Sequence, residues 1–87
     1  MGNETEWFIY KVVREIISYK DLPNAIRIME AKQVSFEERV KKFKAFAFGL
    51  YDTYNHDYFL QFKREEGWKP IEDFIDSKIK AYSELVK

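Results

Sequence analysis

Cysteine is absent from the 87 residues, which excludes disulfide bridges and thiolate metal sites and favours a reducing compartment. Glycine occurs only at Gly2, Gly49 and Gly67, so the sequence has no glycine-rich loop of the kind that holds phosphate. No apolar run approaches the roughly twenty residues that span a bilayer, and the acidic, polar start lacks the features of a signal peptide. We therefore expect a cytoplasmic protein without a membrane partner.

An excess of charge is absent as well. Lysine and arginine together number 15, aspartate and glutamate together also number 15, and the formal net charge is zero. Global electrostatics therefore favour neither nucleic acid nor an anionic membrane. Aromatic residues, in contrast, are abundant: eight Phe, six Tyr and two Trp bring a large apolar area to a small chain. This excess favours a partner surface or an oligomer.

The spacing of the apolar residues is helical throughout, and no alternating strand pattern competes with it. After a loose tail at residues 1–5, the pattern predicts helices over about 6–19, 25–32, 36–66 and from 70 onward. We expect Thr5 to cap the first helix and Asn24, after the break at Pro23, to cap the second. The sequence thus predicts an all-α bundle of four or five helices, forming a single domain over residues 1–87 around the long helix 36–66.

The long helix has clear signals at both ends. Ser35 and Glu38 form a capping box, which predicts that the helix begins at Phe36. Gly67 is expected to end it in a left-handed C-cap conformation, and Pro70 to open the final helix. A break near 52–55, where Asn55 could cap a new helix, stays open.

Each predicted helix has an apolar face for the core. In the first helix this face comprises Phe8, Ile9, Val12, Val13, Ile16 and Ile17. In the long helix it comprises Phe36, Val40, Phe43, Ala47, Leu50, Tyr54 and Tyr58. Gly49, inside the long helix, is expected to permit a close helix crossing.

A second aromatic strip lies off the main stripe of the long helix. It comprises Phe48, Tyr51, Phe59 and Phe62. Either both faces of the helix are buried in the bundle, or the strip contacts another protein or a second copy of the chain, and a self-complementary strip would form a twofold dimer. These four residues are the candidate protein-interaction site.

A nucleic-acid alternative rests on residues 24–44, which have the outline of a helix-turn-helix. Their local positive charge comes from Arg39, Lys41, Lys42 and Lys44. The turn has no glycine, however, and Glu37 and Glu38 occupy the helix start that would approach phosphate.

Catalytic chemistry has little support in the sequence. His56 lies four residues after Asp52 and could pair with it, but a solvent-facing ion pair has the same spacing. We assign no catalytic, cofactor-binding or metal-ligating residue. The leading hypothesis is a non-enzymatic protein-interaction or regulatory module, and the alternative is a small DNA-binding regulator that uses residues 24–44.

Overall fold

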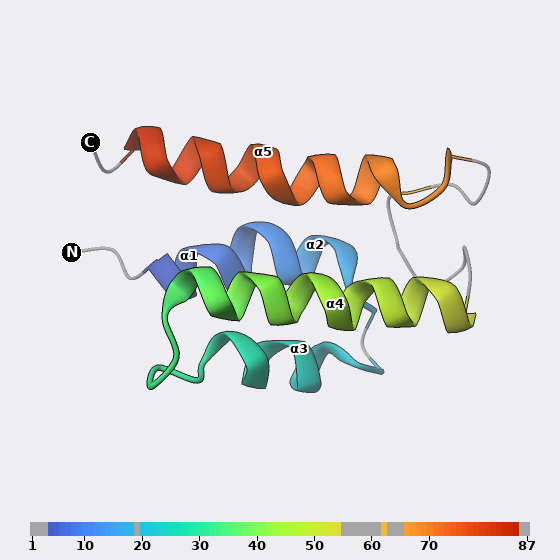
Figure 1. Cartoon of the computed structure of the whole chain (residues 1–87), viewed down its shortest axis with the longest axis horizontal. Coiled ribbons are helices and arrows are strands. Elements are labelled where there is room, and N and C mark those ends of the chain that lie inside the picture. The colour runs from blue at the N-terminus through green and yellow to red at the C-terminus, as the bar shows by residue number, and fades with distance from the viewer. Residues whose placement is uncertain (1–3, 19, 55–61, 63–65, 86–87) are drawn as a thin grey trace.

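The computed structural model describes residues 4–18, 20–54, 62 and 66–85, with the side chain of Tyr54 left out. Every helix or strand assigned in these ranges is a helix, which confirms the all-α bundle (Figure 1). One continuous helical stretch consists of α1 (Glu4–Phe8), the π-helix η1 (Ile9–Val13) and α2 (Arg14–Ile16). It is followed by α3 (Leu22–Met29), α4 (Phe36–Tyr54) and α5 (Lys69–Leu85).

The first helical stretch differs from the prediction at both ends. It already includes Glu4 and Thr5, so Thr5 is not its N-cap, and it ends at Ile16, because Ile17 has an extended backbone with φ −98° and ψ 132°. Thr5 is buried instead, where its hydroxyl accepts a hydrogen bond from Arg39. In the π-helix the N–H of Arg14 donates to the carbonyl of Ile9, five residues earlier, which gives this turn one extra residue.

Helix α3 begins at Leu22, three residues earlier than predicted, and ends at Met29. Pro23 does not interrupt the helix, because it lies in the first turn, where a backbone N–H has no hydrogen-bond partner within the helix anyway. Asn24 is therefore inside the helix rather than at its cap. Its side chain donates to Asp21 at 3.4 Å and accepts from Arg27 at 3.3 Å.

Helix α4 begins at Phe36 as predicted, and the hydroxyl of Ser35 accepts a hydrogen bond from the N–H of Glu38 at 3.2 Å. The described part of the helix extends to Tyr54, and Phe62 lies outside any helix. A single helix over 36–66 is therefore wrong. The predicted roles of Asn55, His56, Tyr58 and Phe59 fall outside the described residues.

The connection into the last helix contains Gly67, whose φ of 77° confirms the predicted left-handed conformation. Glu66, just before it, lies in a 3₁₀ turn, and α5 begins at Lys69, one residue before Pro70. The preceding residues 63–65 are outside the described part of the chain. Gly67 is thus confirmed as a left-handed turn residue before α5.

The buried core contains the whole predicted face of the first helix and Val40, Phe43, Ala47 and Leu50 of the predicted face of the long helix, whereas Phe36 is only half-buried. Its members are Phe8, Ile9, Val12, Val13, Ile16, Ile17, Ala25, Met29, Val40, Phe43, Ala47, Leu50, Ile71 and Ile75. Phe8 is fully buried and makes edge-to-face ring contacts with Phe43 at 5.6 Å and with Phe36 at 5.8 Å between centroids. Helical periodicity therefore identifies the buried face of the first helix and most of the described buried face of α4.

The arrangement of the helices leaves one side of α4 open. In Figure 1, α4 lies in front of the first helical stretch, with α5 above it and α3 below it. The first stretch packs against both α3 and α5, and α3 packs against α4. Lys41, Ala45, Phe48 and Asp52 of α4 are all exposed. Among the described residues, this side of α4 is therefore a surface of the molecule.

Candidate interaction surface

Three aromatic rings meet where the chain enters α5, and we call Phe48, Tyr51 and Trp68 the aromatic cluster. The ring of Phe48 contacts Trp68 edge to face, with 5.2 Å between centroids, and is stacked with Tyr51 at 6.4 Å. Tyr51 and Trp68 are 5.9 Å apart. The cluster therefore joins the outer side of α4 to the residue that precedes α5.

Phe48 is 48% exposed, although it touches two other rings, whereas Phe43 on the same helix is fully buried. Five residues of an α-helix turn through about 140°, so the two phenylalanines point to different sides of α4. Since Phe43 is fixed in the core by its contact with Phe8, Phe48 cannot turn inward without breaking that contact. The exposure of Phe48 is thus imposed by the packing of the core.

Gly49 does not have the predicted role. Among the described residues, a Cβ atom built at Gly49 would meet nothing within 4 Å, so no described helix crosses closely there. Gly49 and Ala45 instead leave the exposed surface next to Phe48 without bulky side chains. The small residues and the exposed ring thus lie together on the open side of α4.

The structure brings together only part of the predicted aromatic strip. Phe48 and Tyr51 are neighbours, but Phe62 is half-buried and packs edge to face against Phe74 of α5, with 5.7 Å between centroids. Phe59 is outside the described residues. Trp68, which the sequence places in a connection, takes its position beside Phe48 through the path of the chain into α5, and no local pattern indicates that contact.

The candidate nucleic-acid residues do not form one exposed basic face. Arg39 is 6% exposed, and Lys44 is half-buried with its Nζ 2.6 Å from Oδ1 of Asp76 on α5. Lys41 and Lys42 are exposed, and Nζ of Lys41 lies 3.8 Å from a carboxylate oxygen of Glu38. Of the four candidate residues, only Lys41 and Lys42 are therefore exposed to a phosphate.

Charges beside the cluster are paired on the α5 side. Nζ of Lys69 lies 3.0 Å from Oδ1 of Asp73, one helical turn later. Hydrogen bonding to this carboxylate, together with its negative charge, raises the pKa of Lys69 above its ordinary value. Because the pair is exposed, it contributes little to stability, and it adds no net charge beside Trp68.

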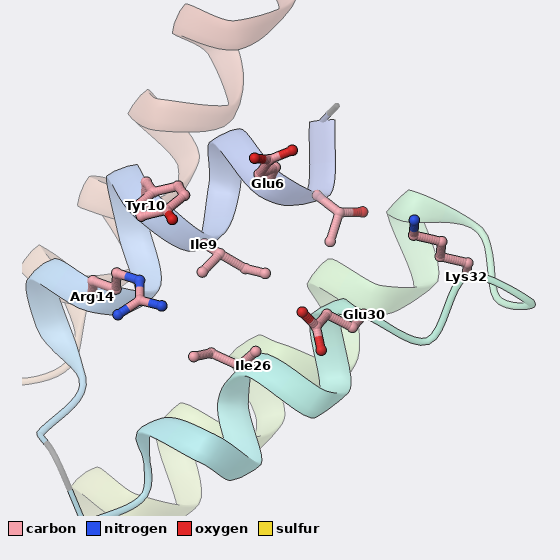
Figure 2. A pocket seen from close by; sticks show the side chains of 8 residues that line it. Glu6, Ile9, Tyr10, Arg14, Ile26, Glu30 and Lys32 are labelled. Atoms are coloured by element: carbon pink, nitrogen blue, oxygen red, sulfur yellow. The ribbon is translucent and has the colours of Figure 1, made fainter. Parts of the chain in front are cut away.

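A separate hollow lies between the first helical stretch and α3 (Figure 2). Ile9 and Ile26 provide apolar surface, and the guanidinium of Arg14 lies 5.0 Å from the centroid of the Tyr10 ring. The charged lining residues are Glu6, Arg14, Glu30 and Lys32. Two carboxylates and two cations balance, so the lining charges favour neither an anionic nor a cationic ligand.

Among the helices in the described part of the chain, none combines the length and apolar character that a membrane crossing requires. Comparison with protein-family models, with curated proteins and with solved structures gives no match. A function for this chain has therefore to be inferred from its own residues and their geometry.

Proposed function

We propose that the chain is a non-enzymatic protein-interaction or regulatory module of the cytoplasm that binds through the aromatic cluster. The observation that carries the proposal is Phe48, a large apolar ring that is 48% exposed while it contacts Tyr51 and Trp68. Aromatic rings in desolvated patches commonly contribute most of the binding energy at protein interfaces. The cluster offers such a patch.

The way in which the cluster is held supports this role. Phe48 and Tyr51 are one helical turn apart on α4, a 19-residue helix whose opposite side is in the core. Trp68 is half-buried against both rings. Because the rings are already packed before a partner arrives, little side-chain entropy is lost on binding. Such a surface suits recognition rather than chemistry.

The proposal is tested by affinity capture from the cells in which the protein occurs, comparing the wild type with Phe48→Ser. Leu85→Ser is the matched control. Leu85 is also a large apolar residue on the surface, 70% exposed, but it lies at the end of α5 away from Trp68 and is not part of the aromatic cluster. We expect Phe48→Ser to lose the captured protein and Leu85→Ser to retain it. Circular dichroism should show the same helicity for all three proteins.

The opposite pattern would contradict the proposal. If the folded Phe48→Ser variant captures the same proteins in the same amounts as the wild type, the aromatic cluster is not the binding surface.

A further inference from the structure

We infer that the molecule which binds at Phe48 is a second copy of the chain, docked antiparallel along the exposed side of α4. The inference rests on the proposed interaction function and specifies its partner. Four exposed residues of α4 recur at intervals of four, three and four positions: Lys41, Ala45, Phe48 and Asp52. We call them the α4 seam. This spacing keeps residues on one line facing a second helix, as in a coiled coil.

The charges of the seam determine the direction of docking. Lys41 is at one end and Asp52 at the other, about 16 Å apart along the helix axis. A parallel pair would place Lys41 against Lys41 and Asp52 against Asp52, which is repulsive. In an antiparallel pair with its twofold axis between Ala45 and Phe48, Lys41 faces Asp52 of the second copy, and this contact occurs twice. The seam is therefore complementary to itself in the antiparallel direction alone.

The shape of the seam agrees with the same register. The twofold axis that pairs Lys41 with Asp52 also places Phe48 opposite Ala45 of the second copy. The space beside Gly49 is open, since a Cβ atom there would meet nothing within 4 Å, and Ala45 is exposed. Each Phe48 ring can thus lie on the small residues of the other chain. Charge and shape select one register independently.

The size of the seam indicates a weak dimer. Helix α4 has 19 residues and is about 28 Å long, so two such helices bury less than the roughly 800 Å² per partner of a standard interface. We expect reversible association with a dissociation constant in the micromolar range or weaker. Association of this strength lets a change in protein concentration shift the balance between monomer and dimer.

Sedimentation equilibrium of the full chain, with charge reversals at the seam, tests the inference. Lys41→Asp places two carboxylates opposite each other at both ends of the dimer, and Asp52→Lys places two cations there. Each single variant should weaken association at least about tenfold, because like charges face each other at both ends. The double variant Lys41→Asp plus Asp52→Lys restores opposite charges at both ends. It should associate with an affinity close to that of the wild type.

Mixing the two single variants gives a second readout. One chain then has only acidic ends and the other only basic ends, so the mixture should form a heterodimer although neither chain associates well alone. Lys80→Asp and Glu84→Lys are the matched controls, because they make the same kind of charge reversal at exposed positions of α5. Both controls should associate like the wild type.

Two results would overturn the inference: a wild type that stays monomeric at millimolar concentration, or a dimer that the charge reversals leave unchanged. The capture experiment separates this failure from failure of the proposed function. If Phe48→Ser still loses its captured partner, the surface binds a different protein. If that capture is also unaffected, the proposed function fails as well.

Discussion

Nη1 of Arg39 donates a hydrogen bond of 2.7 Å to the backbone carbonyl of Met29, the last residue of α3. Its Nε donates to the carbonyl of Val34 at 3.0 Å, and its guanidinium lies 5.7 Å from the centroid of the Phe36 ring. Arg39 itself belongs to α4. One buried side chain therefore connects the end of α3, the turn after α3 and the start of α4.

Replacing Arg39 by methionine should destabilise the fold by about 3 kcal/mol, because the substitution keeps the apolar stem but leaves buried carbonyl groups without a donor. Arg39→Lys should also destabilise, since an ammonium cannot reproduce the directions of the guanidinium N–H groups. Urea unfolding measures both values. A loss below about 1 kcal/mol for Arg39→Met would mean that water satisfies these carbonyls.

Phe43 and Phe48 should respond very differently to the same truncation. Phe43→Ala creates a cavity beside Phe8 and should cost about 4 kcal/mol, whereas Phe48→Ala removes a half-exposed ring and should cost less than about 1.5 kcal/mol. Thermal or chemical unfolding of the two variants checks this. Equal losses would show that Phe48 contributes to the fold as much as a core residue does.

Gly67→Ala should destabilise by about 1 kcal/mol, because φ at this position is 77° and a Cβ atom disfavours the left-handed region. The nearest side-chain atom, the hydroxyl oxygen of Tyr51, would be 3.8 Å from the new Cβ, so the cost is in the backbone rather than in a clash. Gly67→Asn is the matched comparison and should lose less, since asparagine tolerates this conformation. A neutral Gly67→Ala would contradict the left-handed turn.

Gly49→Ala should have the opposite sign. Gly49 lies inside α4, where alanine is favoured by about 1 kcal/mol, and the added methyl group meets nothing within 4 Å. Unfolding at a protein concentration low enough to keep the chain monomeric should therefore show increased stability. Decreased stability there would indicate a close neighbour at Gly49, as the sequence alone predicts.

The sequence predicts the parts of the fold that depend on local chemistry. Ser35 and Glu38 locate the start of α4, and the spacing of Val40 and Phe43 identifies its buried side. The start of α3 is predicted too late, because Pro23 is equally compatible with a turn and with the first turn of a helix. Only the packing of α3 against the rest of the bundle distinguishes the two.

The candidate site is predictable only in part. Phe48 can be identified as a surface candidate because it lies off the main apolar stripe of the helix. Its contact with Trp68 joins residues far apart in the sequence, so helical periodicity does not predict it. The sequence assigns Arg39 to a basic surface because Lys41 and Lys42 come soon after it. Its spacing of three from Phe36 and four from Phe43 places it on the buried side, and this signal could have identified it as a core residue.

The chain has two tryptophans that report on different surfaces, and this makes the central claim directly measurable. Trp68 belongs to the aromatic cluster, whereas Trp7 packs against Tyr82 with 5.3 Å between ring centroids. Tyr82 lies 14 residues beyond Trp68, which corresponds to about 20 Å along α5. Labelling with 5-fluorotryptophan gives each position its own ¹⁹F resonance, and Trp7→Phe assigns the two.

The decisive measurement is the ¹⁹F spectrum of the labelled protein at increasing concentration and then in a concentrated extract of the cells in which it occurs. Our account predicts that the Trp68 resonance shifts or broadens while the Trp7 resonance stays in place. A Trp68 resonance that remains unchanged through both series, or a Trp7 resonance that changes equally, would contradict the aromatic cluster as the interaction surface.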